Sequence, residues 1–237
     1  MNKVATIISN FNMPERTDAL VEHISDHEIP CQIVVVDNGS KMVPPSKYTT
    51  VSLPDNVQTT GGWLAGLDQA KGADYYWIMI TSAEFLGPEV LRPMVDFMDA
   101  HPEAVGAHPA LSLDSTAWAH LLTQGGDEPR EVKFIDNIAA LWRASWFDSI
   151  GQFDPSLRYA WGSDLETCHV ARTQGQTMWV MEPAGMKKVT DIGYTMGRMG
   201  MTAERRRELA RRNMESVLSR KYGPDWHDRM YGWQNES

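Results

Sequence analysis

Two apolar runs of this sequence end abruptly in polar residues that could bind a ligand. The run Gln32–Val36 stops at Asp37-Asn38-Gly39-Ser40, and the run Tyr75–Ile80 stops at Thr81-Ser82-Ala83-Glu84. In sheets flanked by helices, ligands gather just beyond the carboxyl ends of the strands. Carboxylates and hydroxyls at such places can form hydrogen bonds with a bound molecule. The pattern therefore indicates a ligand site where these two strands end.

A pair of glycines, Gly61-Gly62, lies between these two runs. We expect residues 56–70, NVQTTGGWLAGLDQA, to be a glycine-bearing loop that runs into a helix. Because glycine has no side chain, the backbone there can approach a ligand closely. A plain loop before a helix explains the pair equally well. Trp63 could stack on a ligand, although packing in the core is the simpler interpretation.

An α/β architecture would bring these residues to one edge of a sheet. Lys3–Ser9 is typical of a first strand, and a helix is expected after Pro14. The run Gln32–Val36 is too continuously apolar for a half-exposed strand, which indicates a central parallel strand. The alternation of strand, loop and helix predicts a three-layer α/β fold.

After about residue 110 the pattern loosens, but two further helices are marked. Ser163 is a natural N-cap, and Glu166 three residues later would complete a capping box, so we expect a helix to begin at Asp164. A C-terminal helix is expected from near Thr202 to Gly223-Pro224, where glycine and proline end it.

Composition limits the class of protein. The chain has 237 residues, 42% apolar and 22% charged, which fits one large folded domain or two small ones. No apolar run approaches the roughly 20 residues of a membrane span, and the first residues are typical of a strand rather than a signal peptide. The two cysteines, Cys31 and Cys168, fit neither a disulfide framework nor a zinc site. We therefore expect a cytoplasmic protein.

Charge is unevenly distributed along the chain. The net charge of −9 argues against a nucleic-acid partner held by its phosphates. Residues 204–221, however, carry seven basic and three acidic side chains. This basic helix could contact an anionic substrate or a membrane surface. Its mixture of Glu and Arg is more typical of a solvated face.

Five short motifs, in order, resemble those of one enzyme family. They are Phe11-Asn12-Met13 before Pro14, the intact Val36–Ser40, Asn56 with Gly62 and Gly66, Gly151–Pro155, and Ser163-Asp164. Over most of residues 3–190 the chain resembles the inverting family 2 glycosyltransferases, which have the nucleotide-sugar-binding GT-A fold. Gln58, Thr60 and Trp63 depart from the third motif. The resemblance implies a GT-A-like three-layer sandwich with a central mixed, mostly parallel sheet.

The resemblance also implies a domain organisation and an activity. A GT-A-like domain would cover residues 1–198, with a nucleotide-binding half at about 1–110 and an acceptor half at about 111–198. A C-terminal helical extension would cover residues 199–237. The implied activity is transfer of a sugar from a nucleoside diphosphate sugar, with UDP favoured, to an acceptor hydroxyl on a glycan or lipid-linked sugar, with inversion.

The donor-binding residues implied by the resemblance are Asn10, Asn12, Asp37, Gly61, Gly62, Ser82, Lys187 and Lys188. Asp37 would hold the nucleoside, since a carboxylate can accept hydrogen bonds from a base N–H or a ribose hydroxyl. The alternative is that Asp37 only caps the Asn-Gly turn that follows it.

The family's catalytic base corresponds to Asp164. Inverting transfer needs a carboxylate that takes a proton from the acceptor hydroxyl. The positive end of the helix favours the ionised form, so we expect Asp164 to be deprotonated at neutral pH. Burial beside Trp161 and a nearby diphosphate would act in the opposite direction. The alternative is that Asp164 is only a favourable acid in the first helical turn.

The family's Asp-x-Asp motif is degenerate here. The aligned residues are Thr81-Ser82-Ala83, and a later histidine ligand falls near Lys187-Lys188. Glu84 could hold Mn²⁺ or Mg²⁺ together with the nucleotide, although strand alternation points it away from the face of Ala83. Alternatively Lys187, Lys188 or Arg198 neutralises the diphosphate without a metal. In a third interpretation the site has decayed, which leaves a catalytically silent nucleotide-sugar-binding or assembly protein.

Overall fold

The structure is a computed structural model that describes residues 3–189, 197–198 and 200–235. Its elements, in chain order, are β1 (Val4–Asn10), α1 (Pro14–His27), β2 (Gln32–Asp37), β3 (Val51–Ser52), α2 (Gln58–Gln69), β4 (Tyr75–Met79), β5 (Ala83–Phe85), α3 (Leu91–Ala100), β6 (Ala104–Leu111), η1 (Ala119–Leu121), β7 (Arg130–Val132), β8 (Ala139–Arg143), α4 (Ala144–Ser149), α5 (Ser163–Thr173), β9 (Thr177–Lys188), α7 (Ala203–Tyr222), α8 (Trp226–Tyr231) and η2 (Gly232–Asn235).

One mixed sheet runs through the molecule, with strand order β3-β2-β1-β4-β8-β6-β9-β5 and with β7 paired to β9. Strands β1 to β4 are mutually parallel, and β8 is antiparallel to both β4 and β6. Asn10 is in register with Asp37, so β1 and β2 end at the same level. The predicted α/β class is confirmed, and the polar residues after these strands share one edge.

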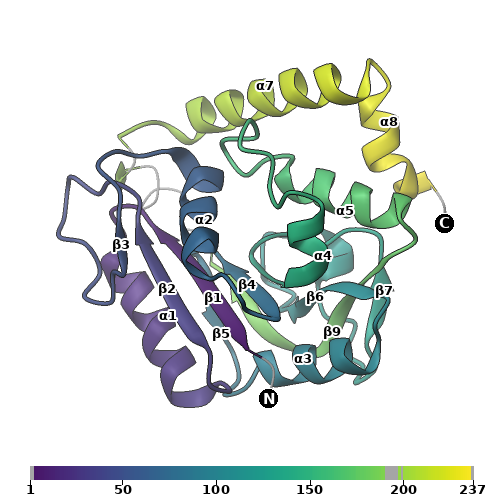
Figure 1. Ribbon diagram of the computed structural model, residues 1–237, viewed down its shortest axis with the longest axis horizontal. Coiled ribbons are helices and arrows are strands. Elements are labelled where there is room, and N and C mark those ends of the chain that lie inside the picture. The colour runs from purple at the N-terminus through teal and green to yellow at the C-terminus, as the bar shows by residue number, and fades with distance from the viewer. Residues whose placement is uncertain (1–2, 190–196, 199, 236–237) are drawn as a thin grey trace.

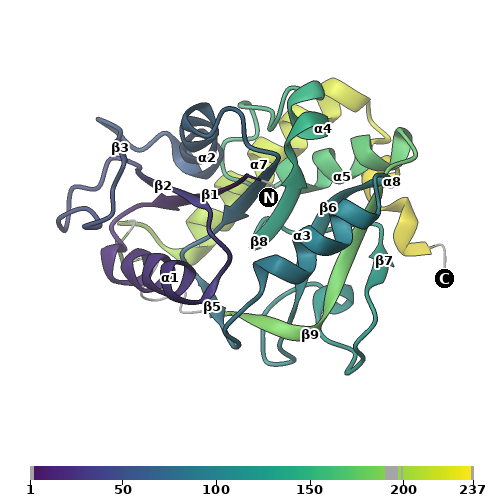
Figure 2. The same cartoon turned by 60° about the horizontal axis from the view of Figure 1, so that its bottom comes forward.

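Helices cover both faces of the sheet (Figure 2). α2, α4 and α5 lie on one face, and α1 and α3 lie on the other. Because successive side chains of a strand point to opposite faces, β4 sends aromatic rings into both layers. The ring of Tyr76 lies 6.2 Å from that of Phe147 in α4, whereas the ring of Trp77 lies 5.9 Å from that of Phe85. Phe85 in turn stacks on His23 of α1 at 3.9 Å. The three predicted layers are therefore present.

The C-terminal helix α7 crosses the edge of the sheet at which β1 and β2 end (Figure 1). It is held there by a small apolar cluster of Leu157, Val217, Leu218, Trp226 and Met230. Gly162 lies beneath it, and a Cβ at this position would come within 2.8 Å of Met214 Cγ. The C-terminal helices therefore pack directly on the loop that precedes α5.

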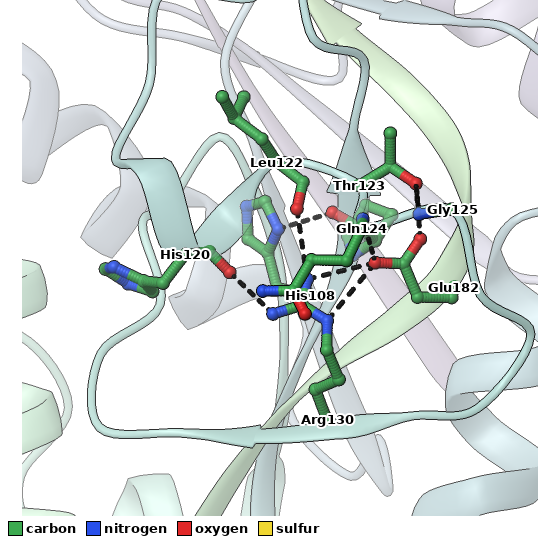
Figure 3. Close-up of polar contacts among 9 residues, drawn as sticks. His108, His120, Leu122, Thr123, Gln124, Gly125, Arg130 and Glu182 are labelled. Carbon is green, nitrogen blue, oxygen red and sulfur yellow. Dashed lines mark hydrogen bonds and ion pairs between the residues drawn. The ribbon is translucent and has the colours of Figure 1, made fainter. Parts of the chain in front are cut away.

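A buried ion pair holds the segment between β6 and β7 against β9 (Figure 3). Arg130 Nη2 lies 3.0 Å from Glu182 Oε1, and the same guanidinium donates to the carbonyls of His120 and Leu122, each at 3.1 Å. The Thr123 hydroxyl donates to Glu182 Oε2 at 2.6 Å. Burial alone would raise the pKa of Glu182, but these hydrogen bonds outweigh it and lower that pKa. The network orders a segment that has little secondary structure of its own.

Candidate active site

The ends of β1 and β4 and the start of α2 enclose a hollow of about 200 Å³. Arg206, from the helix that crosses this edge, also lines it. The described lining residues offer hydroxyls, amides, apolar rings and one guanidinium, but no carboxylate. They are Ser9, Phe11, Met13, Asn38, Asn56, Gln58, Thr59, Trp63, Ile80, Thr81, Ser82 and Arg206.

The turns after β1 and β2 are fixed by their own polar side chains. Asn10 donates from Nδ2 to Asp37 Oδ1 at 3.2 Å and accepts from the backbone N–H of Met13 at 2.9 Å. The Asp37 carboxylate also accepts from the backbone N–H of Ser40 at 3.2 Å. Asp37 thus caps its turn, as the alternative interpretation held, and it does not itself line the hollow. Its oxygens keep lone pairs that a ligand could use, so nucleoside binding stays a prediction.

Asn12 joins three segments near the hollow. Its φ of 56° is in the left-handed region, which Asn tolerates better than most residues. Oδ1 accepts from the backbone N–H groups of Lys41 and Met42 at 3.0 and 3.1 Å, and Nδ2 donates to the carbonyl of Arg198 at 2.9 Å. The side chain of Asn12 is therefore engaged by the protein, and contact with a donor stays a prediction.

Gly61 and Gly62 lie inside α2 rather than in the expected loop. A Cβ at Gly62 would overlap Ser9 Oγ and lie 3.0 Å from Asn38 Nδ2. Glycine is required at this position because the helix packs directly on the end of β1. Neither glycine is among the residues that line the hollow, whereas the adjacent Trp63 is. The expectation of a loop is wrong, and the absence of a side chain serves helix packing.

The first turn of α2 connects the two acidic positions singled out in the sequence. Asn38, which follows Asp37, donates to the first carbonyl of α2 at 2.9 Å. Two residues further on, Thr60 Oγ1 lies 3.2 Å from the hydroxyl of Ser163, which precedes Asp164. The end of β2 and the start of α5 therefore meet at the same end of α2, beside the hollow.

Helix α5 begins without the expected capping box. Its N-cap is Gly162, with φ of 88°, and no side chain caps the helix. Ser163 turns toward Thr60 instead, and Glu166 accepts from the hydroxyl of Tyr222 at 2.8 Å. Lys221 Nζ lies 2.5 Å from the same carboxylate. The capping-box prediction is wrong because contacts with α2 and α7 occupy both side chains.

Asp164 lies half-buried at the start of α5, in a site that favours its neutral form. Burial raises the pKa of Asp164 well above its usual range, and the carboxylate of Asp136 raises it further. The backbone N–H of Leu165, at 2.8 Å, and the charge of Lys188 lower it by less. The sequence predicts that the helix end dominates and keeps Asp164 ionised. In the structure burial, which favours the neutral form, has the larger effect on its pKa. Trp161, which was expected beside Asp164, is 44% exposed.

Asp136 and Lys188 complete a cluster around Asp164. Lys188 Nζ lies 3.8 Å from Asp136 Oδ2. Burial also raises the pKa of Asp136, against the opposing effect of Lys188. The buried His108 adjoins this cluster, and burial lowers its pKa to about 4, so it adds no positive charge at neutral pH. The carboxyls of Asp136 and Asp164 can share a proton beside the ammonium of Lys188. Such an arrangement suits acid–base chemistry.

The remaining predicted residues lie on β5 and β9. Lys187 pairs with Glu84 across the two strands, and its Nζ lies 2.5 Å from Asp114 Oδ2. Glu84 is exposed and lines a second hollow beside α1, and Ser82 lines both hollows. Among these residues Ser82 is the best placed for a ligand in the first hollow. Lys188, unlike Lys187, faces the acidic cluster.

Arg206 is a site residue that no sequence prediction includes. The available signal was the basic segment 204–221, which contains Arg205, Arg206 and Arg207 in succession. Only the docking of α7 determines which of these side chains faces the hollow. Arg198, a predicted alternative to a metal ion, forms an ion pair with Glu15 at 3.7 Å.

No family model and no curated protein matches the chain, but many solved structures do. GalNAc-T7 with UDP, GalNAc and Mn²⁺ is 12% identical, with a TM-score of 0.72 over 100% of this chain and 51% of that one. The mannosyltransferase PcManGT from Pyrobaculum calidifontis, with GDP-Man and Mn²⁺, is 16% identical. Its TM-score is 0.66, and the match covers 97% of this chain and 69% of that one. Residues 1–349 of S. aureus TarS with UDP are 13% identical. The TM-score is 0.59, and the match covers 93% of this chain and 74% of that one.

These structures are GT-A-type glycosyltransferases, and they align with nearly all of this chain. The chain has the GT-A fold. It spans about half the length of GalNAc-T7 and 38% of a longer TarS structure. Within the described residues, no helix has the length and apolar character needed to cross a bilayer.

The side chains of this GT-A domain do not fit a divalent cation in the hollow. Cations such as Mn²⁺ and Mg²⁺ prefer carboxylate oxygens, and the described lining supplies none. Across residues 3–189, 197–198 and 200–235, no group of three or more His, Cys, Asp or Glu side chains could hold a metal. Glu84 remains a predicted ligand, but Lys187 opposite it provides an unfavourable neighbour for a cation.

Proposed function

We propose that this protein transfers a sugar from a nucleoside diphosphate sugar to an acceptor hydroxyl, with inversion at the anomeric carbon. The GT-A fold supports this proposal, as does a hollow with hydroxyl, amide and guanidinium groups at the carboxyl ends of the parallel strands, where ligands gather in such sheets. UDP is the favoured nucleotide, because GalNAc-T7 and TarS were both solved with it. GDP is the second candidate, since PcManGT was solved with GDP-Man.

The observation that carries the proposal is the position of Asp164. It follows Ser163, whose hydroxyl contacts the first turn of α2, and Thr59 of that turn lines the hollow. Lys188, which contacts Asp136 in the cluster around Asp164, is in register with Ala83 of β5. The residue before Ala83, Ser82, lines the hollow. These contacts support the proposal that the Asp164 carboxylate acts on an acceptor next to a donor in the hollow.

In the proposed reaction Asp164 acts as the general base. Its carboxylate takes the proton of the acceptor hydroxyl while the oxygen attacks the anomeric carbon, and the nucleoside diphosphate leaves from the opposite side. A base is most effective when its pKa lies near the working pH. Burial and Asp136, which raise the pKa of Asp164, favour this role. Lys188 would hold Asp136 in place beside it.

Donor recognition is assigned to groups at the hollow. Ser82 and Thr59 would offer hydroxyls to the phosphates or the sugar, and Trp63 would offer part of its apolar ring. Asp37 would accept hydrogen bonds from the nucleoside through lone pairs that its turn does not use. Asn10 and Asn12 support this position by fixing the two turns.

The test is a screen of nucleotide sugars with simple hydroxyl acceptors, in which release of free nucleoside diphosphate is measured. The wild-type protein should turn over at least one donor, and Asp164→Asn should abolish that turnover while donor binding, measured by calorimetry, persists. Asp68→Asn, which changes an exposed acid on α2 that forms an ion pair with Lys71, is the matched control and should keep full activity.

Two results would contradict the proposal. Full transfer activity in Asp164→Asn would show that another group is the base. Tight donor binding by the wild-type protein, without turnover of any donor or acceptor, would favour the alternative of a catalytically silent nucleotide-sugar binder.

A further inference from the structure

Arg206 carries a charge that the described residues solvate only with neutral groups. Its Nη1 donates to Gln58 Oε1 at 3.3 Å, and its Nη2 donates to Thr59 Oγ1 at 3.1 Å. The guanidinium carbon lies 4.6 Å from the centre of the Tyr159 ring. Burial lowers the pKa of Arg206, which reflects the cost of removing this charge from water.

Other arginines of α7 have a different environment. Arg211 forms ion pairs with Glu208 at 2.7 Å and Glu215 at 2.8 Å, and Arg212 also pairs with Glu208. No ion pair of this kind joins Arg206 to any carboxylate in the described part of the chain. A half-buried guanidinium without a countercharge favours binding of an anion, because the anion would supply the missing charge.

The surroundings of Arg206 complement an anion as well. Gln58 and Thr59 open α2, whose N-terminal end carries a partial positive charge. The hollow that they share with Arg206 is lined by hydroxyls, amides and apolar side chains and by no described carboxylate. A guanidinium can bind two phosphate oxygens at once, which suits a diphosphate better than a single ammonium does.

We propose that Arg206 binds the diphosphate of the donor and stabilises the leaving group, in place of a divalent cation. During transfer the bond between the anomeric carbon and the diphosphate oxygen breaks, and its electron pair stays on that oxygen. The acceptor oxygen forms the new bond, and its proton passes to Asp164. Arg206 donates hydrogen bonds to the diphosphate as its negative charge increases. The inference rests on the proposed function, because it assumes a nucleoside diphosphate donor.

The test measures the binding of UDP, UMP and uridine by calorimetry in EDTA, for the wild type, Arg206→Gln and Arg206→Lys. Charge-assisted hydrogen bonds contribute about 1.5–3 kcal/mol, so Arg206→Gln should weaken UDP binding by about 10- to 100-fold. Uridine binding should be unchanged, since it has no phosphate. Arg206→Lys should restore part of the affinity for UDP.

Arg207→Gln is the matched control, because it removes the adjacent exposed charge of the same helix and should leave UDP binding unchanged. An equal loss of UDP and uridine affinity in Arg206→Gln would overturn the inference, since it would indicate that Arg206 only supports the fold. UDP binding by the wild type that collapses in EDTA and returns with Mn²⁺ would also overturn it. If the wild type binds none of several nucleoside diphosphates, the proposed function itself fails.

Discussion

At the scale of single residues, Asp164 is subject to two opposing effects. The helix start and the backbone N–H of Leu165 favour its ionised form, whereas burial and the carboxylate of Asp136 disfavour it. Burial dominates because the low dielectric of the site penalises the charge itself, while the helix end supplies only a partial charge. A carboxyl tuned in this way is a stronger base than one exposed at a helix start. Sequence position alone could not reveal this balance.

The pH dependence of transfer should report the coupling between Asp164 and Asp136. The proposed base must be deprotonated to act, so kcat/KM should fall as pH decreases through the raised pKa of Asp164. Asp136→Asn removes a like charge, which should lower that pKa and move the acidic limb to lower pH. The measurement is a pH–rate profile of both proteins. An unchanged or upward-shifted limb in the variant would contradict the assigned coupling.

At the scale of elements, the segment between β6 and β7 depends on side chains rather than on regular structure. Between β6 and β7, the chain forms one short 3₁₀ helix, η1, and is otherwise irregular. The carboxylate of Glu182 is 1% exposed, and it binds the Arg130 guanidinium together with polar groups of this segment. Removing one partner of such a pair leaves the other charge buried and unpaired.

Glu182→Gln should therefore lower the free energy of unfolding by about 3 kcal/mol at neutral pH. Because the pKa of Glu182 is lowered in the folded protein, its contribution is fully present above the ordinary Glu pKa of about 4.3 and is lost as pH falls through the lower folded value. The stability difference between wild type and variant should shrink over that acidic range. Urea denaturation at several pH values measures it, and a difference that does not depend on pH would argue against an ionised Glu182.

At the scale of the whole molecule, α7 joins the C-terminal residues to the hollow. The apolar cluster around Leu157 and Leu218 fixes the helix, and the same helix carries Arg206 into the site. Residues separated by some 150 positions, Gln58 and Arg206, therefore share a hydrogen bond. The predicted boundary between a domain ending at 198 and a C-terminal extension remains a prediction, but the two parts contribute to one candidate site.

Leu218→Ala should affect both stability and ligand binding. Loss of a fully buried leucine should lower the free energy of unfolding by about 2–5 kcal/mol. If α7 loosens, UDP affinity should fall as well, because Arg206 loses its fixed position. Thermal denaturation and calorimetry measure the two effects, with the 73% exposed Leu113 changed to alanine as the control. A destabilised Leu218→Ala protein with wild-type UDP affinity would indicate that α7 does not contribute to UDP binding.

The sequence by itself determined the α/β class and the places where strands end, because continuous β-branched runs and turn residues are local signals. The resemblance to a glycosyltransferase family also pointed to Asp164, whose role remains a prediction, and to Thr81-Ser82-Ala83 in place of an Asp-x-Asp motif. The tertiary structure alone decided that Gly62 packs against Ser9 and that Ser163 contacts Thr60 instead of capping α5. It likewise decided the burial that raises the pKa of Asp164, and which of three consecutive arginines faces the hollow. The reason is physical: burial, charge proximity and close packing depend on segments far apart in the chain, whereas the sequence pattern records only neighbours.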